Sequence, residues 1–263
     1  MDLQLQGGTA FISGSSQGIG YAIASALAAE GVQVTLSGRD AARLSAAVDR
    51  IRDEHPGSSP RGLVADFAKP EEVSRLIESL GDIDILVNNV GLFGLADFES
   101  IADEEWARYL DVNLMSGVRL SRHLLGGMLR RDRGRIIFIS SESGVNVPAD
   151  MVHYGVTKAA MLALGNGLAK LTRGTSVTVN TVLGGPTYSE GVAAAVHAIA
   201  ETQAMSVEAM KDAVIAQNRT TLLERFIEPA EIGSLVAYLA SPRASATNGA
   251  AVRADGGVLT AML

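Results

Sequence analysis

The stretch at residues 13–20, Ser13-Gly14-Ser15-Ser16-Gln17-Gly18-Ile19-Gly20, joins a short apolar run to a helical pattern. Its glycines let the backbone turn tightly and approach a ligand closely. The helix that follows presents free N–H groups and the positive end of its dipole, which together attract a pyrophosphate. The spacing G-x-x-x-G-x-G therefore predicts a dinucleotide-binding loop, with a plain glycine turn as the alternative when the motif is taken alone.

Outward from this loop, short apolar runs alternate with longer helical patterns along the chain. Apolar strands between amphipathic helices indicate a parallel sheet covered on both faces. Right-handed crossovers then make the fold class α/β, a doubly wound Rossmann-type sheet with the strand order 3-2-1-4-5-6-7. We expect seven strands, at residues 9–13, 32–37, 62–66, 83–88, 135–140, 175–182 and 250–254, and helices at residues 19–30, 41–54, 71–80 and from about 103.

The alternation runs without a linker, so residues 1–263 are expected to form a single domain. Residues 188–221 break the rhythm with an Ala-rich helical segment between the sixth and seventh strands. Ligands bind at the carboxyl ends of parallel strands, and this segment begins at such an end. It is therefore expected to be a lid over the site, and additional core packing is the alternative.

Composition limits the partners that the chain can have. It contains 29 acidic and 22 basic residues, a net charge of −7, and no cysteine. Without clustered cations a nucleic-acid partner is not expected, and without cysteine disulfides, thiolate catalysis and zinc–cysteine sites are excluded. The four histidines share no metal-ligand spacing, so no metal is expected. Since no apolar stretch approaches the roughly 18–20 residues of a membrane helix and the N-terminus has no signal-peptide features, we expect a soluble, cytoplasmic protein with no membrane partner.

A second motif is the pair Tyr154 and Lys158, four residues apart in a helical pattern. At this spacing the phenol and the ammonium lie on one face of the helix, within reach of each other. A cation beside a phenol favours the phenolate and lowers a pKa that is otherwise about 10. Such a tyrosine can exchange a proton with an alcohol or a carbonyl, although pairs with this spacing also occur by chance in helices.

Together, the glycine loop and this pair resemble the short-chain dehydrogenase/reductase (SDR) family. The resemblance covers nearly the whole chain, from Gly14 to Asp255-Gly256-Gly257, and Asn88-Asn89-Val90-Gly91 stands where the family usually has N-N-A-G. It implies an NAD(P)(H)-dependent oxidoreductase, a short-chain alcohol dehydrogenase or carbonyl reductase. Such an enzyme moves a hydride between a nicotinamide and a carbonyl or secondary alcohol, its small-molecule substrate.

The resemblance also implies a catalytic set of Asn113, Ser141, Tyr154 and Lys158. Ser141, thirteen residues before Tyr154, would hold and polarise the substrate oxygen, while Tyr154 exchanges the proton as general acid/base. Lys158 would lower the pKa of Tyr154 and hold the nicotinamide ribose, and Asn113 would keep a proton-relay water aligned. Ser140 is the neighbouring alternative to Ser141 and is expected to point into the sheet.

The choice of cofactor depends on the end of the second strand, Ser37-Gly38-Arg39-Asp40. A carboxylate at the position of Gly38 would bind the adenosine ribose hydroxyls and select NAD(H). Here Gly38 is followed by Arg39, and a guanidinium suits a 2′-phosphate. NADP(H) is therefore favoured over NAD(H). Two features oppose this: Gln17 stands where phosphate-preferring relatives are often basic, and Asp40 can partly occupy Arg39.

Further cofactor contacts follow from the resemblance. Asp66, with Phe67 behind it, matches the family's acid near the adenine amino group, and a helix cap is the alternative for Asp66. After the sixth strand, Gly184 replaces the family's proline and predicts a looser turn before Thr187 and Ser189, which are placed to meet the carboxamide and the pyrophosphate. The full set expected to bind the cofactor is Gly14, Ser16, Gln17, Gly18, Ile19, Gly20, Arg39, Asp66, Phe67, Asn89, Gly91, Tyr154, Lys158, Pro186, Thr187 and Ser189.

The predicted substrate contacts are Ser141, Ser143 and Tyr188. The pocket around them is expected to include residues 90–93 and 143–147, His153 and the region after Tyr188, and to be largely apolar. Such a pocket suits ring ketones, keto esters, acyl chains and steroids alike, and fold analogy does not choose among them. Glu142 suggests a cationic or polyol substrate, with an exposed or core-capping glutamate as the more common alternative.

The family's habit implies a homo-oligomer, a tetramer, and the apolar tail at residues 258–263 suits a subunit interface. Besides a redox enzyme, two other functions use the same scaffold. A catalytically silent, cofactor-sensing module is the first, and the complete four-residue set argues against it. A non-redox epimerase or dehydratase that uses the same Tyr154 and Lys158 is the second, and the short chain argues against it.

Overall fold

The sheet of this protein is built as the sequence pattern predicts. The structure, a computed structural model, describes residues 1–218 and 220–262. In this part of the chain seven parallel strands lie in the order β3-β2-β1-β4-β5-β6-β7, which confirms the predicted α/β fold and strand order. The strands are β1 (Thr9–Ile12), β2 (Gln33–Gly38), β3 (Arg61–Val64), β4 (Ile85–Asn88), β5 (Arg135–Ser141), β6 (Thr178–Gly184) and β7 (Ala251–Ala254).

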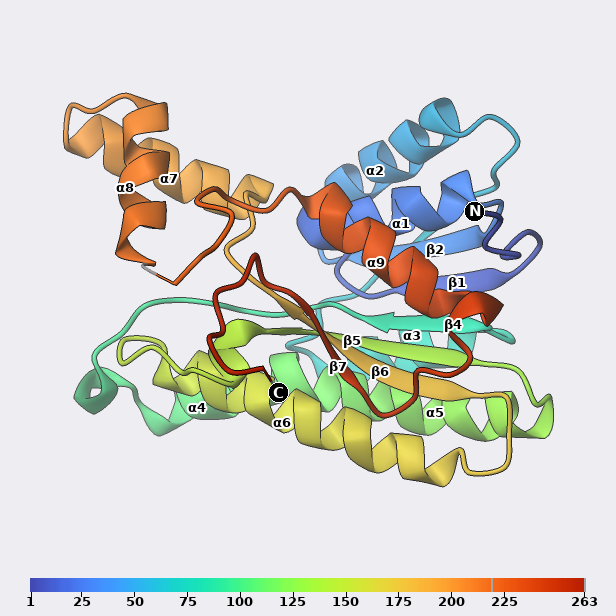
Figure 1. The fold of residues 1–263 in the computed structure, drawn as a ribbon. Coiled ribbons are helices and arrows are strands. Elements are labelled where there is room, and N and C mark those ends of the chain that lie inside the picture. The colour runs from blue at the N-terminus through green and yellow to red at the C-terminus, as the bar shows by residue number, and fades with distance from the viewer. Residues whose placement is uncertain (219, 263) are drawn as a thin grey trace.

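Helices cover both faces of the sheet (Figure 1). One face carries α1 (Gly18–Ala29), α2 (Ala41–Glu54) and α9 (Pro229–Ala240); the other carries α3 (Pro70–Ser79), α5 (Ser116–Arg130) and α6 (Val152–Leu171). A short helix, α4 (Asp103–Tyr109), continues through a π-helical turn (Leu110–Met115) into α5, and α7 (Glu190–Thr202) and α8 (Val207–Gln217) lie between β6 and α9. Within the described residues, no helix is both long and apolar enough to cross a membrane.

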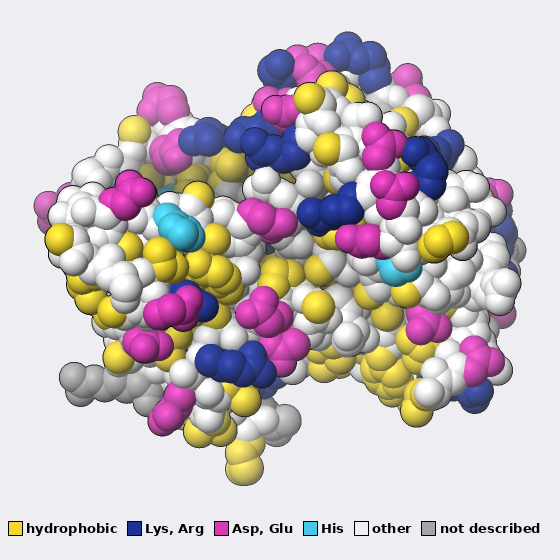
Figure 2. Space-filling view, turned by 90° about the horizontal axis from the view of Figure 1, so that it is seen from above, with side chains coloured by type: hydrophobic (Ala, Val, Ile, Leu, Met, Phe, Trp, Pro, Cys, Tyr) yellow, Lys and Arg dark blue, Asp and Glu magenta, His cyan; other side chains and the backbone are white. Residues whose placement is uncertain are grey.

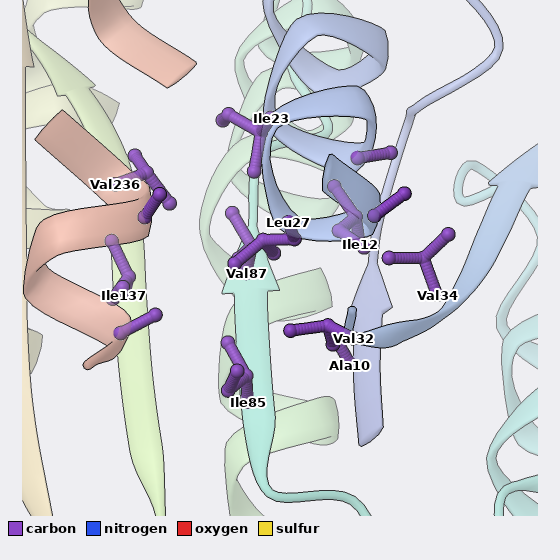
Figure 3. Packing of buried hydrophobic residues seen from close by; sticks show 14 of the residues in the cluster. Ala10, Ile12, Ile23, Leu27, Val32, Val34, Ile85, Val87, Ile137 and Val236 are labelled. Atoms are coloured by element: carbon purple, nitrogen blue, oxygen red, sulfur yellow. The ribbon is translucent and has the colours of Figure 1, made fainter. Parts of the chain in front are cut away.

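The strands divide their side chains between the two helical layers. On β1, Ile12 lies in the cluster with α1 and α9, while its neighbour Phe11 lies in the cluster with α5 and α6. This alternation follows from the two-residue repeat of a strand. Figure 3 shows Ile12 and Val87, from paired strands, on the same side as Leu27 of α1 and Val236 of α9. Both faces of the sheet are therefore packed, and its carboxyl edge is a rigid base for the loops that follow.

The helix α9 is missing from the helices that the sequence analysis predicts. It packs closely along α1, because a Cβ at Gly233 would lie 2.9 Å from the carbonyl oxygen of Ala22. Its start carries two signals that are readable in the sequence: Pro229 in the first turn, and a capping box between Glu228 and Glu231. These two signals could have predicted the start of α9 from the sequence.

The predicted lid at residues 188–221 contains α7 and α8, which project from the body of the molecule (Figure 1). They pack on each other through a small apolar cluster of Val196, Ala200 and Met210, distinct from the two clusters beside the sheet. These helices therefore add nothing to the two main clusters, and their role as a lid stays a prediction. Arg219 of the predicted lid and Leu263 of the predicted apolar tail lie outside the described residues.

Candidate active site

The glycine loop turns from β1 into α1 with its backbone tightly enclosed. Gly20 has no room for a side chain, because a Cβ there would lie 2.3 Å from the carbonyl oxygen of Gly14. Gly18 has a φ of +62°, in the left-handed region that favours glycine. At the end of β4, Nδ2 of Asn89 donates to the carbonyls of Ser13 (3.0 Å) and Gly14 (2.8 Å). Asn89, predicted as a cofactor contact, thus shapes the loop itself.

A cleft of about 360 Å³, here called the adenosine cleft, opens beside this loop over the carboxyl ends of the first strands. Arg39 and Arg43 both line it, and Nη1 of Arg43 donates to Oε1 of Gln17 at 2.8 Å. The sequence analysis missed Arg43, although its place in the first turn of the helix predicted at residues 41–54, four residues after Arg39, was the available signal. The residues predicted to bind a cofactor that meet in this cleft are Gly14, Ser16, Gln17, Arg39, Asp66, Phe67 and Gly91.

The end of β2 has Gly38 at the position where a carboxylate would select NAD(H). A Cβ at Gly38 would lie 3.0 Å from Oγ of Ser16, so this hydroxyl fills the place of a selecting carboxylate. The expected pairing of Asp40 with Arg39 is wrong. The carboxylate of Asp40 instead accepts the backbone N–H of Arg43 at 2.9 Å and caps α2, and this hydrogen bond holds the pKa of Asp40 below its usual value.

A second cleft of about 260 Å³, the catalytic cleft, continues from the glycine loop to the predicted catalytic pair. Its lining includes Gly18 and Gly20 of the loop, Gly91 after β4, and Tyr154 and Lys158 of α6. The loop and the catalytic pair, far apart in the sequence, thus face one space.

Lys158 is buried beneath this cleft, with only 5% of its surface exposed. Its Nζ donates to the carbonyl oxygen of Ile139 at 2.8 Å. Burial lowers the pKa of Lys158 to about 8, because the charged ammonium loses its hydration, and the charge of Glu142 partly opposes that change. A Cβ at Gly91 would lie 3.6 Å from both this Nζ and Oδ1 of Asn113, so these two polar groups flank Gly91.

Tyr154 does not show the lowered pKa that the sequence analysis expects. Burial raises the pKa of the phenol well above its usual value, and a hydrogen bond with Ser141 opposes that effect only in part. The Nζ of Lys158 lies 5.5 Å from the centre of the Tyr154 ring and is hydrogen-bonded to the backbone instead. The phenol is therefore held in its protonated form.

Asn113 lies in the π-helical turn and ties three segments together. Its Oδ1 accepts the N–H of Leu92 at 2.7 Å, and its Nδ2 donates to the carbonyl of Leu92 (3.0 Å) and to Oγ1 of Thr157 (2.9 Å). The amide thus joins the loop after β4 to α6, the helix that carries Tyr154 and Lys158. π-Helical turns are often found at functional sites.

Ser141 ends β5 and meets a carboxylate. Its Oγ donates to Oε2 of Glu142 at 2.5 Å and accepts the N–H of Ser143 at 3.1 Å, while Oγ of Ser143 donates to Oε1 of Glu142 at 3.2 Å. Burial raises the pKa of Glu142, and the two serine hydroxyls oppose that change. The Oγ of Ser140 donates to the carbonyl of Lys158 in α6 at 2.9 Å, and Ser140 is among the residues that line the catalytic cleft. Glu142 is half-buried, and its carboxylate contacts the hydroxyls of Ser141 and Ser143 rather than solvent alone.

His153 packs in the interior, although the sequence analysis places it in the substrate pocket. Only 2% of its surface is exposed, and its ring centre lies 4.1 Å from that of Tyr109 and 6.3 Å from that of Trp106. Phe93, an exposed apolar residue, lines the catalytic cleft instead. Figure 2 shows a hollow between two lobes, with hydrophobic side chains in it and charged side chains around it. Among the described residues, no group of three His, Asp or Glu is arranged to hold a metal ion.

Tyr188, the third predicted substrate contact, lies in a different groove. Its ring centre is 5.4 Å from that of Phe226, and the Nζ of Lys211 lies 4.6 Å from it. The groove that it lines runs between α1, α7 and α9. The structure therefore brings Ser141 and Ser143 together near Tyr154, and it does not bring Tyr188 to them.

The turn after β6 is held more firmly than the loss of the family's proline suggests. A Cβ at Gly185 would lie 2.5 Å from the carbonyl oxygen of Asp255, so the chain passes directly against the end of β7. The N–H of Ile227 donates to the carbonyl of Pro186 (2.8 Å), and the N–H of Tyr188 donates to the carbonyl of Ile227 (2.9 Å). The turn is thus fixed by backbone contacts.

Thr187 and Ser189, predicted to bind the cofactor, have local partners. Oγ1 of Thr187 donates to the carbonyl of Gly185 at 2.9 Å. The hydroxyl of Ser189 accepts the N–H of Val192 at 3.5 Å and caps α7. Ser189 nevertheless lines the catalytic cleft, so the base of the lid forms one of its walls.

Comparisons with known proteins agree with this geometry. The chain matches the family model for short chain dehydrogenases over residues 8–200. It is 41% identical over 260 residues to YvaG, an uncharacterized oxidoreductase of Bacillus subtilis, covering 98% of each chain. It is 42% identical over 267 residues to YvrD of the same organism, also an uncharacterized oxidoreductase, covering 100% of each. Among solved structures, L-sorbose reductase from Gluconobacter frateurii, complexed with NADPH and L-sorbose, is similar with a TM-score of 0.94 at 31% identity, covering 100% of both chains.

The strand order, the glycine loop and the cleft that joins this loop to Tyr154 and Lys158 are those of an oxidoreductase built on a Rossmann-type sheet. This chain belongs to the short-chain dehydrogenase/reductase family.

Proposed function

We propose that this protein is an NADP(H)-dependent carbonyl reductase or secondary-alcohol dehydrogenase. The observation that carries the proposal is that two clefts meet at the glycine loop, one lined by Arg39 and the other by Tyr154 and Lys158. The adenosine end of a dinucleotide would be held in the first cleft and its reactive end in the second. The NADPH bound to the similar L-sorbose reductase supports the same cofactor.

The residues present fit such a cofactor. Gly20 leaves the floor of the loop free of side-chain atoms, and the first N–H groups of α1 can donate to a pyrophosphate. Arg39 and Arg43 both line the adenosine cleft, and guanidinium groups suit a 2′-phosphate; Oγ of Ser16 lies 3.0 Å from the place of a Cβ at Gly38, where a selecting carboxylate would begin. These three side chains support NADP(H) over NAD(H).

When bound, the nicotinamide would give a hydride to a carbonyl carbon or take one from an alcohol carbon. The protein's own residues then handle the oxygen and its proton. Ser141 would hold the substrate oxygen, and the Tyr154 hydroxyl would give it a proton during reduction or take one during oxidation. A phenol is protonated at neutral pH, which is the state that reduction requires, and burial shifts the pKa of Tyr154 further in that direction.

For the substrate, we propose a small polar ketone or the corresponding alcohol. Glu142 supports this choice, since its carboxylate stands beside Ser141 and can accept hydrogen bonds from substrate hydroxyl groups. L-Sorbose, bound in the similar reductase, is the first compound to test. The exposed apolar Phe93, which lines the catalytic cleft, makes short keto esters the second class to test.

We also propose a single-domain chain that works in the cytoplasm as a homotetramer. The uninterrupted sheet supports the single domain, and the family resemblance supports the rest. Light scattering on a size-exclusion column measures the mass directly, and a monomer would refute the tetramer.

The function is tested first without a substrate, by titrating the protein with NADPH and NADH side by side. We expect both to bind and NADPH to bind more tightly. Tighter binding of NADH would refute the role of Arg39, and binding of neither would refute the proposed function.

Tyr154→Phe separates a redox enzyme from a cofactor sensor. The variant lacks the hydroxyl that exchanges the proton, so we expect turnover of ketone substrates to be abolished while NADPH binds as in the wild type. Turnover would be followed as loss of NADPH absorbance. Retained turnover would exclude Tyr154 as the acid. A wild-type protein that binds NADPH but reduces no ketone in a broad screen would favour the sensor or a non-redox reaction.

A further inference from the structure

A carboxylate from the base of the lid lies on the glycine loop. Oε2 of Glu190, the first residue of α7, accepts the backbone N–H of Gly18 at 2.6 Å, across 172 residues of sequence. The neighbouring Ser189 is also close, since a Cβ at Gly18 would lie 3.4 Å from its Cβ and 3.6 Å from Oε2 of Glu190. The start of α7 thus rests directly on the first turn of α1.

The position of this carboxylate is one that favours an anion. Gly18 begins α1, and the free N–H groups and dipole of a helix N-terminus attract negative charge. In the described part of the chain, Glu190 has no cationic partner, and its side chain contacts this N–H instead. The attraction between the helix end and the carboxylate therefore accounts for the contact.

The same N–H groups are the donors that the proposed function assigns to the cofactor's pyrophosphate. Gly18, Ile19 and Ser189 line one cleft together with Tyr154 and Lys158, so Glu190 reaches onto the path that the cofactor would take. Two anions cannot share one N–H group without strong repulsion at this distance. Either the carboxylate or the pyrophosphate can occupy the position.

We propose that Glu190 is a latch that competes with the pyrophosphate of the cofactor for the N-terminus of α1. This proposal rests on the proposed function, because it needs a dinucleotide in the same cleft. Binding of the cofactor displaces the carboxylate and frees the start of α7. Because α7 and α8 pack on each other as one unit, the release of this contact couples cofactor binding to the position of the lid. Glu190 thereby determines cofactor affinity without contributing to the chemical step.

Three variants of Glu190 test the latch through the dissociation constant of NADPH, measured by fluorescence titration. Glu190→Gln removes the charge, and Glu190→Ala removes the contact and the charge. Glu190→Asp keeps the charge but shortens the side chain by one methylene, so it retreats from Gly18. We expect NADPH to bind about two- to five-fold more tightly to the first two variants, the range for one favourable exposed charge at a helix N-terminus, and tighter than wild type to the third.

A second ligand and a matched variant serve as controls. Adenosine 2′-monophosphate has the adenosine and the 2′-phosphate but no phosphate at the 5′ position, so its affinity should not change in any Glu190 variant. Glu201→Gln removes the same charge from an exposed position near the other end of α7 and should leave NADPH binding as in the wild type.

The outcomes separate the latch from the function on which it rests. NADPH affinity that is unchanged or weaker in Glu190→Gln and Glu190→Ala overturns the latch while leaving the oxidoreductase intact. An equal gain in affinity for adenosine 2′-monophosphate also overturns it, since the effect is then a general change in the electrostatic potential of the cleft. If neither the wild type nor any variant binds NADPH or NADH, the proposed function fails.

Discussion

Asn113 and Lys158 show how single residues organise this site: their polar atoms are already bonded within the protein. The amide of Asn113 is engaged by Leu92 and Thr157, and the Nζ of Lys158 donates to Ile139. Groups held in this way need little reorganisation when a substrate arrives, which is a large part of what an enzyme contributes.

Glu142, directly after the proposed catalytic Ser141, determines whether the serine hydroxyl can donate a hydrogen bond to a substrate. When Glu142 is ionised, the hydroxyl of Ser141 donates its hydrogen to the carboxylate, and its oxygen is left to accept. When Glu142 is protonated, Ser141 is free to donate to a carbonyl. Burial raises the pKa of Glu142, which brings the protonated state closer to neutral pH.

Arg39 offers a prediction at the scale of one residue. Arg39→Ala removes a guanidinium from the adenosine cleft, so NADPH binding should weaken by roughly 1.5–3 kcal/mol, the range for a charge-assisted hydrogen bond, while NADH binding should not change. Calorimetric titration with both cofactors measures this. Arg43→Ala is the parallel variant on the same cleft and should act in the same direction. Equal losses for NADPH and NADH would show that Arg39 does not bind a 2′-phosphate.

At the scale of elements, α1 makes two kinds of contact, one through its N-terminus and one along its flank. Its N-terminus meets the catalytic cleft and the carboxylate of Glu190, and its flank packs along α9. The close approach of these helices depends on Gly233, where a Cβ would meet the backbone oxygen of Ala22. A backbone atom cannot rotate away, so a side chain there would push the two helices apart.

Gly233→Ala should therefore lower the free energy of unfolding by roughly 1–3 kcal/mol, the range for overpacking. Gly167→Ala on α6 is the matched control, because a Cβ there meets nothing within 4 Å. That variant should be about 0.5–1 kcal/mol more stable than the wild type, since alanine is the better helix former. Urea denaturation measures both. A Gly233→Ala variant as stable as Gly167→Ala would refute the packing argument.

At the scale of the whole molecule, the burial of one ionisable group lowers stability at neutral pH. Lys158 is almost wholly enclosed, and burial lowers its pKa to about 8 from a usual value of 10.5. Between those two pH values the unfolded chain keeps the proton that the folded chain has released. The unfolded state then binds more protons, so the folded state gains stability as the pH rises through this window.

The stability difference between the wild type and Lys158→Met isolates this effect. From pH 7.5 to pH 10.5 the wild type should gain on the order of 1–3 kcal/mol relative to the variant. Guanidinium denaturation of both proteins across this range measures it. Lys170→Met, on the exposed face of the same helix, should show no such gain. A difference that is flat with pH would mean that Lys158 is not desolvated.

The sequence by itself determined the strand order and the glycine loop, and it proposed the members of the catalytic set. These features are local: an apolar run, a glycine at a fixed spacing, and a tyrosine one helical turn before a lysine can all be read along the chain. Repeating strands and helices allow few topologies, because crossovers are right-handed. The predicted strands at residues 9–13 and 83–88 accordingly lie within a few residues of β1 and β4.

Only the tertiary structure decided which groups these residues meet. Tyr154 has a raised pKa rather than a lowered one, because burial outweighs a cation that faces the backbone. Asp40 caps a helix instead of pairing with Arg39, and Tyr188 lies in another groove. The contact of Glu190 with Gly18 spans 172 residues. Desolvation and contacts between distant segments depend on how the chain closes on itself, and no spacing along the sequence records them.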